Sequence, residues 1–317
     1  MFKTLRDAWG IPELRKKLMF TVVILLIYRF CSAIPVPFVD TNSIATAMES
    51  VLQTTILGLY DMMSGSALSQ ASILALGIQP YINASIIIQL LTVAIPALER
   101  MAKEEGEVGK KKIERITRYT TVALGLILGY GYYAMLKTQG LLVPGNVGDV
   151  WVGIVIVLAF TAGSSVVMWM GEQITEFGIG NGISMILFAN IISGLPGTFS
   201  RLLGFKWWVA AIIAVVMLLL VVFIVFINDA ERRIPIQYAK RVVGRQVYGG
   251  QNTNLPIKVA MSGVMPVIFA QSIVSLPATI CTFTGKVDGW WYKNIWGSDT
   301  WTYAGFYFLL IFFFSWF

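Results

Sequence analysis

The feature that most constrains this chain is a series of apolar runs, most of them long enough to cross a lipid bilayer as helices. Eight such runs occur, at Leu18–Ile34, Ser72–Leu98, Ile116–Leu136, Val150–Met170, Ile183–Leu195, Trp207–Ile227, Val259–Ile280 and Tyr303–Phe317. About 20 apolar residues cross the ~30 Å hydrocarbon core of a membrane. Only 13% of the 317 residues are charged, whereas soluble domains contain about 25%. The sequence therefore predicts an all-α polytopic membrane protein.

The Lys and Arg residues predict how these helices are oriented. Five precede the first run, seven lie in the loop after the second run and six in the loop after the sixth, whereas five lie in the connections on the other side. Because cytoplasmic loops are enriched in Lys and Arg, the N-terminus is predicted to be cytoplasmic. Arg29 lies within the first run, and we expect it to snorkel toward the outer edge of the membrane.

The connections contain two further elements that the pattern singles out. Ile56–Gln70 is apolar but too short and broken to span, so we expect it to fold back into a cavity on the outer side. A surface amphipathic helix is the alternative for this stretch. The glycine-rich "FGIGNGIS" precedes the short fifth run, and it is interpreted as a flexible break from which a helix starts inside a protein-lined space.

The second and seventh runs share the pattern G-x-x-P-x-I-x-A. Gly77, Pro80, Ile82 and Ala84 match Gly263, Pro266, Ile268 and Ala270 at a constant offset of 186 residues. The two runs cross the membrane in opposite directions, so the match indicates an inverted repeat. Inverted repeats in membrane proteins place the functional path at their interface.

Both repeated runs carry polar side chains that are costly in lipid unless they pair or meet water. They are Asn83, Ser85 and Gln89 on the second run, and Gln271, Ser272 and Ser275 on the seventh. We expect them on a seam between the two helices, each made bendable by a mid-membrane proline. Ile78, Ile82 and Ile268 would then form a narrow apolar constriction, which excludes ions by dewetting. Ordinary helix packing with polar contacts is the alternative.

Catalytic chemistry is poorly supported by this sequence. It contains no His and has no Asp or Glu at the centre of a predicted span. A membrane hydrolase needs a positioned acid, base or metal, and an ion-coupled transporter normally keeps acidic or histidine relays in its spans. No catalytic residue, metal ligand or cofactor site is therefore predicted. A small-solute transporter remains an alternative because the inverted repeat also permits one.

The inner loop "RRIPIQYAKRVVGRQVYGG" mixes basic, aromatic and glycine residues. A loop of this composition could project as a hairpin and offer Arg241 and Arg245 to phosphates or to an acidic partner. The alternative is a simple anchor that obeys the positive-inside rule.

Several long motifs, in order along the chain, resemble the bacterial SecY family. They are "LRKKLMFTVVILLIYRF", "LGIQPYINASIIIQLL", "GEQITEFGIGNGIS", "RRIPIQYAKR", "GRQVYGGQ" and "LPIKVAMSGVMPVIFAQSI". SecY is the channel subunit of the protein-conducting translocase, and the resemblance covers essentially the whole chain. The family has ten spans, so we expect this chain to be cut short within the eighth.

The resemblance implies a channel between two pseudo-symmetric inverted halves, here residues 1–200 and an incomplete 201–317. A ring of aliphatic side chains would close the central pore, with Ile78, Ile82, Ile183, Leu187 and Ile268 as its members. A plug at about residues 56–70 would contain Ile56, Leu57, Leu59, Tyr60, Met62 and Met63. A lateral gate between spans two and three and spans seven and eight would contain Asn83 and Gln271.

The resemblance also implies partners and a location. The inner loop would dock the ribosome or the SecA motor through Arg232, Arg233, Lys240, Arg241 and Arg245. SecE would clamp the two halves, and SecG would be a further subunit. A translocating polypeptide would use the pore, while signal sequences and membrane anchors would pass through the gate into membrane lipid. We expect a multi-pass protein of the bacterial plasma membrane that is not an enzyme.

Overall fold

The computed structural model of the chain describes residues 10–40, 44, 57–143, 148–204, 206–236, 241–243, 246–248, 253–258, 265–283, 290, 292–296 and 300–316. The chain divides into two compact units. Unit 1 contains Met1–Pro196 and Gln271–Leu309, and unit 2 contains Gly197–Ala270 and Leu310–Phe317. The division into halves at residue 200 is a separate expectation and stays a prediction.

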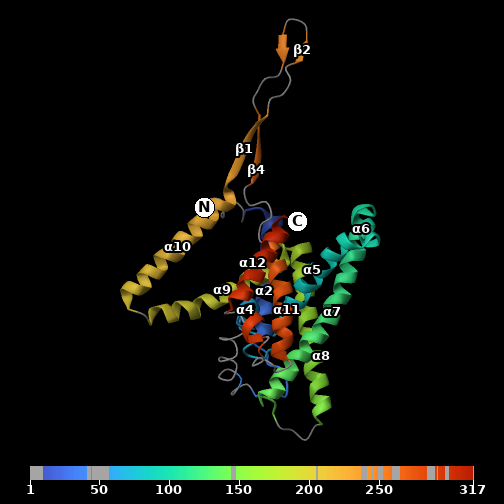
Figure 1. The fold of residues 1–317 in the computed structure, drawn as a ribbon, viewed down its shortest axis with the longest axis vertical. Coiled ribbons are helices and arrows are strands. Elements are labelled where there is room, and N and C mark those ends of the chain that lie inside the picture. The colour runs from blue at the N-terminus through green and yellow to red at the C-terminus, as the bar shows by residue number, and fades with distance from the viewer. Residues whose placement is uncertain are drawn as a thin grey trace. The chain divides into compact units, whose positions relative to one another are not determined.

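Helices dominate the described residues (Figure 1). Their bounds are α2 Pro12–Ser32, α4 Leu57–Ser64, α5 Gln79–Ala94, α6 Pro96–Lys103, α7 Gly106–Thr138, α8 Asp149–Phe177, α9 Gly182–Leu203, α10 Trp207–Asp229, α11 Met265–Phe283 and α12 Trp301–Trp316, with a short π-helix η1 at Tyr292–Trp296. By length and composition, α7, α8 and α10 could each cross a membrane, and α5 with α6 could form one bent span. Two shorter apolar helices are α12 and, within α9, the stretch Gly182–Gly197.

The long helices α7 and α8 pack against each other through small residues. A Cβ atom on Gly129 of α7 would lie 3.4 Å from the carbonyl oxygen of Val157 on α8. An aromatic contact adds to this packing, since the rings of Tyr132 and Phe160 meet edge to face with 5.0 Å between their centroids. Small side chains let helix backbones approach closely, which favours association inside a membrane.

The second apolar run is not one straight helix. Residues 71–78 form turns, and α5 begins after them at Gln79. The axes of α5 and α6 differ by 102° at the break at Ile95. Ile95 has an extended backbone because it precedes Pro96, which disfavours the helical region for that residue. Pro80 occupies the first turn of α5, where its missing N–H breaks no helical hydrogen bond. The predicted mid-membrane kink at Pro80 is therefore wrong.

The turns between α4 and α5 lie inside unit 1. Ala71 is fully buried, and Leu68, Leu74 and Leu76 are almost so. The backbone N–H of Val36 donates to the carbonyl oxygen of Ala71, and that of Ile73 donates to the carbonyl oxygen of Ile34. These two bonds tie the stretch after α2 to the turns. Non-helical backbone at membrane depth needs such a protein cover. Within the predicted re-entrant stretch, Ser64, Gly65, Ala67 and Leu68 are buried, whereas Met62 and Gln70 are exposed. Its re-entrant course stays a prediction.

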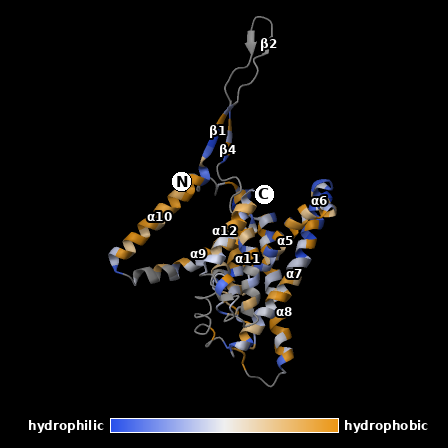
Figure 2. Cartoon of the chain, viewed as in Figure 1, coloured by the Kyte–Doolittle hydropathy of each residue, from blue (hydrophilic) through white to orange (hydrophobic). Residues whose placement is uncertain are grey.

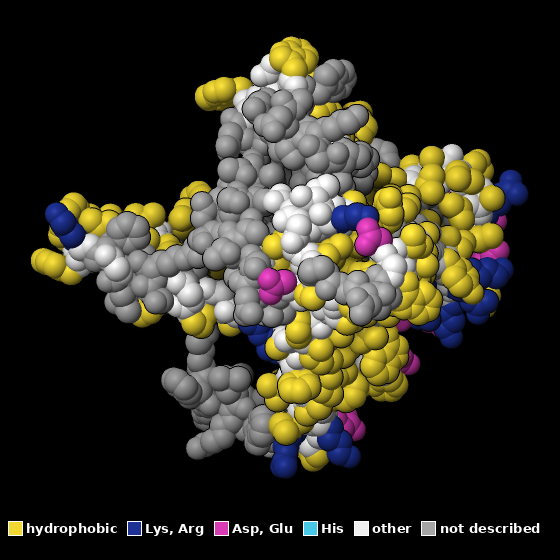
Figure 3. All heavy atoms as spheres, turned by 90° about the horizontal axis from the view of Figure 1, so that it is seen from below, with side chains coloured by type: hydrophobic (Ala, Val, Ile, Leu, Met, Phe, Trp, Pro, Cys, Tyr) yellow, Lys and Arg dark blue, Asp and Glu magenta, His cyan; other side chains and the backbone are white. Residues whose placement is uncertain are grey.

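The described surface is rich in large apolar side chains, especially along α10, α8 and α12. Figure 2 shows the hydrophobic colouring along these helices, and Figure 3 shows one face where hydrophobic side chains predominate. Exposed apolar area on this scale marks a protein or membrane contact surface. A lipid environment accounts for it directly.

Unit 2 adds strands that the all-α expectation did not include. β1 Glu231–Ile236 pairs antiparallel with β4 Thr253–Lys258, and β2 Arg241–Val243 pairs with β3 Gln246–Tyr248. The strands follow α10 and form a long hairpin (Figure 1). The basic inner loop therefore has the hairpin form that its composition favoured.

Candidate functional site

Four of the predicted ring residues belong to one apolar cluster in unit 1. Ile78 and Ile82 come from the start of α5, and Ile183 and Leu187 come from α9. The centre of the cluster is formed by Ile24, Tyr28, Leu74, Ile78, Val167, Met170, Ile174 and Ile186. Ile183 and Leu187 are four residues apart, which places them on the same face of α9. Ile78 is buried and the other three are half-buried, so part of their apolar surface stays open.

The glycine-rich turn before α9 leads directly into a capped helix, and its interpretation as a flexible break stays a prediction. Asn181 caps the helix, because its Oδ1 accepts hydrogen bonds from the backbone N–H groups of Ile183 and Ser184. A Cβ atom on Gly182 would lie 1.9 Å from the carbonyl oxygen of Gly171. Only glycine fits there, and this close approach fixes where Ile183 begins its helix against α8.

The remaining ring and gate residues are placed as follows. Asn83 is buried on α5, at 8% exposure. Gln271 lies on α11 within unit 1, and its Nε2 is buried without a hydrogen-bond partner among the described residues. Ile268 is half-buried on the part of α11 that belongs to unit 2. A gate formed by Asn83 and Gln271, and a ring closed by Ile268, stay predictions.

The described part of the predicted plug is the α4 segment, defined as residues 57–70. Tyr60 and Met63 are half-buried, and Met62 is 59% exposed. Leu57 and Leu59 lie in α4, whereas Ile56 lies outside the described residues. The role of this segment as a plug stays a prediction.

Arg29 is exposed and has a hydrogen-bond partner within the protein, and its expected snorkelling toward the outer edge of the membrane stays a prediction. Its Nη1 donates a 2.9 Å hydrogen bond to the carbonyl oxygen of Gly65, just after α4. The guanidinium thus has a partner inside the protein. A charged group in a membrane segment usually finds such a partner because an isolated charge is costly there.

Two further residues at this place were missed by sequence reasoning. Asn190 on α9 donates to the hydroxyl of Tyr28 and to the carbonyl oxygen of Met63. The available signal was an amide side chain within the apolar run Ile183–Leu195, the same signal that drew attention to Asn83. Tyr28 carried no comparable signal, because a tyrosine near the end of an apolar run is common at a membrane interface.

Comparison with models of protein families identifies the family of this chain. The SecY model matches residues 72–317, which is well over half of the chain. The chain belongs to the SecY family.

Curated SecY proteins agree with this assignment. The protein translocase subunit SecY of Streptomyces galbus is 42% identical over the whole chain, which covers 76% of that protein. The SecY of Corynebacterium glutamicum is 43% identical over 98% of the chain and 74% of its own length. That of Escherichia coli K12 is 42% identical over 90% of the chain and 66% of its own length. The resemblance read from the motifs is therefore confirmed at the level of the family of protein translocase subunits.

Solved structures share the SecY fold. One described as a protein-conducting channel matches with a TM-score of 0.57 at 17% identity, over 86% of this chain and 59% of the other. Sec61 in a canine ribosome-channel complex matches with a TM-score of 0.55 at 17% identity, over 86% of this chain and 60% of the other. The chain thus spans about three fifths of the length of these solved chains. The predicted fold class is confirmed.

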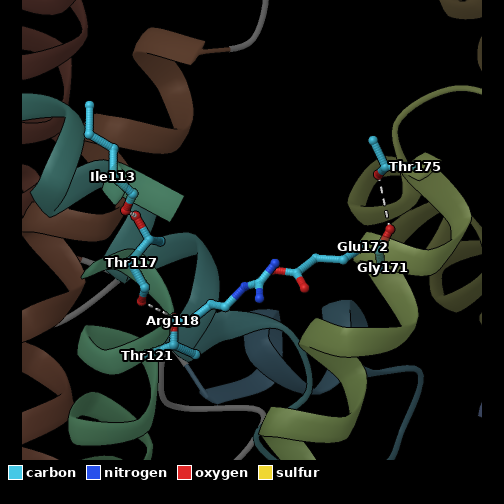
Figure 4. Close-up of polar contacts among 7 residues, drawn as sticks. All are labelled: Ile113, Thr117, Arg118, Thr121, Gly171, Glu172 and Thr175. Carbon is cyan, nitrogen blue, oxygen red and sulfur yellow. Dashed lines mark hydrogen bonds and ion pairs between the residues drawn. The ribbon is translucent and has the colours of Figure 1, made fainter. Parts of the chain in front are cut away.

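Two other features of this SecY chain concern its predicted inner side. Arg118 on α7 and Glu172 on α8 form an ion pair with 2.8 Å between Nε and Oε1, as Figure 4 shows. Ser85 and Gln89, two of the predicted seam residues, line a groove of about 510 Å³ together with Lys110 and Thr117 of α7. Polar groups from both helices thus line the groove together with apolar side chains such as Ile88 and Ile113.

The SecY hairpin presents part of the predicted docking set. Arg232 and Arg233 are exposed on β1, opposite Ile257 and Pro256 of β4. Arg241 is the first residue of β2. Lys240 and Arg245 lie outside the described residues. A docking role for these basic residues stays a prediction.

Proposed function

We propose that this chain forms the polypeptide-conducting pore of a Sec translocase and catalyses no reaction itself. Ile78, Ile82, Ile183, Leu187 and Ile268 would form the constriction, and the α4 segment would close it at rest. An unfolded polypeptide would displace the segment and push the aliphatic side chains apart. The gate near Asn83 and Gln271 would open sideways to release signal sequences and membrane anchors into lipid.

The observation that carries this proposal is the apolar cluster that joins α5 and α9. It gathers four candidate ring residues, which lie far apart in the sequence, around aliphatic neighbours. A narrow opening lined by such side chains resists ions because water leaves it readily. The same side chains form no strong directional bonds, so they can yield to polypeptides of any sequence.

The proposal includes an energy source and partners outside this chain. The ribosome or SecA would dock on the hairpin, and the exposed Arg232 and Arg233 supply positive charge suited to phosphates or acidic side chains. SecE would clamp the halves, and SecG would join the complex. The bias of Lys and Arg supports a plasma-membrane protein with its N-terminus in the cytoplasm.

Replacing Ile82 with glycine in the assembled translocase tests the constriction. We expect the resting ion conductance in a planar bilayer to rise severalfold, because the substitution removes an aliphatic side chain from the seal. Polypeptide transport into vesicles should continue, since no directional contact is lost.

Ile86→Gly is the matched control. Ile86 is buried on the same helix but lies outside the ring cluster, and both substitutions carry the same helix-propensity cost of roughly 1 kcal/mol. Equal leak from Ile82→Gly and Ile86→Gly would contradict the ring assignment. A translocase that conducts a small solute but no polypeptide would favour the transporter alternative.

A further inference from the structure

The amide of Asn190 lies where α2, α9 and the end of α4 meet. Its side chain is 2% exposed. The Nδ2 atom donates two hydrogen bonds, at 2.9 Å to the hydroxyl of Tyr28 and at 2.7 Å to the carbonyl oxygen of Met63. Since a carbonyl can only accept, the nitrogen end of the amide must face Met63. Both N–H groups of Asn190 are thereby used on two different elements.

Arg29 holds the same turn from α2. Its Nη1 donates to the carbonyl oxygen of Gly65 at 2.9 Å, two residues after the carbonyl that Asn190 holds. A hydrogen bond from a charged donor is stronger than one between neutral groups. The adjacent α2 residues Tyr28 and Arg29 thus take part in different ways: Arg29 bonds the backbone of the α4 segment directly, whereas Tyr28 accepts a hydrogen bond from Asn190, which bonds that backbone.

Gly65 makes this contact possible. Its φ is +68°, a backbone conformation that glycine adopts readily and other residues rarely do. A Cβ atom here would lie 2.9 Å from Asn190 Oδ1, and 3.1 Å from both Arg29 Nη1 and Ser193 Oγ. The turn therefore sits directly against the polar side chains, with no room for a larger residue.

The same helix face connects this contact with the constriction. Asn190 follows Leu187 by three residues on α9, so the two side chains lie on one face. Tyr28 itself belongs to the apolar cluster that contains Ile78, Ile82, Ile183 and Leu187. A movement of α9 that opens the ring would also move the amide away from Met63.

We propose that Tyr28, Arg29 and Asn190 are a polar latch that holds Met63–Gly65, and with it the α4 segment, in the resting position. This inference rests on the proposed channel function for its consequence, and on the observed hydrogen bonds for its geometry. The latch fixes backbone carbonyls, so it does not depend on the side chains of the segment. A polypeptide that spreads the ring releases the latch through α9.

The latch is tested by Asn190→Leu in the assembled translocase, with amide hydrogen exchange followed on peptides that cover residues 57–70. Leucine has a similar volume but no donor for Tyr28 or Met63. We expect exchange in this segment to accelerate by roughly tenfold, because local opening no longer has to break the hydrogen bond from Asn190 to the carbonyl oxygen of Met63. Peptides from the α7–α8 contact should keep their exchange rates.

Arg29→Met is a second variant, in case Asn190→Leu fails to assemble, and Ser193→Ala is the control. Ser193 lies on the same face of α9, but within the part of the chain that the structure describes its hydroxyl donates only to the carbonyl oxygen of Asn190 in its own helix. The Ser193→Ala substitution should therefore leave amide hydrogen exchange in residues 57–70 unchanged. Resting ion conductance is measured on all three variants.

The outcomes separate the latch from the channel proposal. Faster exchange with higher resting conductance supports both. Faster exchange with unchanged conductance supports the latch and overturns the plug role of the α4 segment. Unchanged exchange in both latch variants overturns the latch, whatever the conductance.

Discussion

Helices α8 and α10 are both long and apolar, yet they have opposite surroundings. The most apolar window of α10 has a mean hydropathy of 3.5, and none of it is buried among the described residues. The corresponding window of α8 has a mean hydropathy of 2.2, and 44% of it is buried. The more hydrophobic helix is therefore the less buried one.

Side-chain size explains this difference better than hydropathy. α8 contains Gly153, Gly163 and Gly171, and a Cβ atom on Gly163 would lie 2.0 Å from the carbonyl oxygen of Ile73. The middle of α10 is a run of large aliphatic and aromatic side chains without glycine. Lipid is as apolar as these side chains, so hydrophobicity drives no helix association in a membrane. Small residues that permit close backbone contact do.

The strongest test of this comparison removes matched aliphatic side chains from the two helices. Ile156 on α8 is fully buried, and Leu219 on α10 is 59% exposed. Ile156→Ala should lower the free energy of unfolding by about 2–5 kcal/mol because it leaves a cavity. Leu219→Ala should change it by less than about 0.5 kcal/mol, as exposed substitutions usually do. Both are measured by thermal or denaturant unfolding in detergent.

Equal losses in the free energy of unfolding from Ile156→Ala and Leu219→Ala would contradict the difference in burial between α8 and α10. They would mean that α10 is buried in the assembled protein as deeply as α8 is in unit 1. A subunit packed along α10 would be the physical reason, and repeating the measurement without partner chains would reveal it.

A smaller effect is expected from adding one methyl group to α8. Gly163→Ala places its Cβ against the backbone of Ile73, which can relieve the contact only by moving the helix. We expect a loss of about 1–3 kcal/mol, the usual cost of overpacking. Ala211→Leu on α10 adds more volume at an exposed position and should cost nothing measurable. If Gly163→Ala left the free energy of unfolding unchanged, α8 would be able to shift against the buried turns at no cost.

The sequence predicted the elements that depend on composition. The apolar runs around Ile116–Leu136 and Val150–Met170 lie within α7 and α8, and the basic loop forms a hairpin. Ile78 and Ile82 were predicted from the repeated pattern, and Ile183 and Leu187 from the family resemblance. The fold gathers these four residues in one cluster. Length, hydropathy and motif order are local properties of a chain, so they can be read directly.

Other features depend on which groups meet in three dimensions, and these were missed or misread. Pro80 was expected to kink a helix, but the preceding turns place it where a helix begins. Nothing in the local sequence around Arg29 indicated that it would bond the carbonyl oxygen of Gly65, 36 residues away. Asn190 carried the signal of a polar group in an apolar run, yet its partners are 162 and 127 residues away. No local pattern identifies partners at such separations.

The smallest expected effect concerns the ion pair between Arg118 and Glu172, which also joins α7 to α8. The two side chains are 50% and 26% exposed, so solvent screens their attraction. A double-mutant cycle with Arg118→Met and Glu172→Gln should give a coupling free energy of about 0.2–1 kcal/mol. The coupling should decrease in high salt, because salt screens exposed charges. A coupling above about 2 kcal/mol would exceed what exposed pairs supply. It would show that charge attraction, and not only the close approach at glycines, holds α8 against its neighbours.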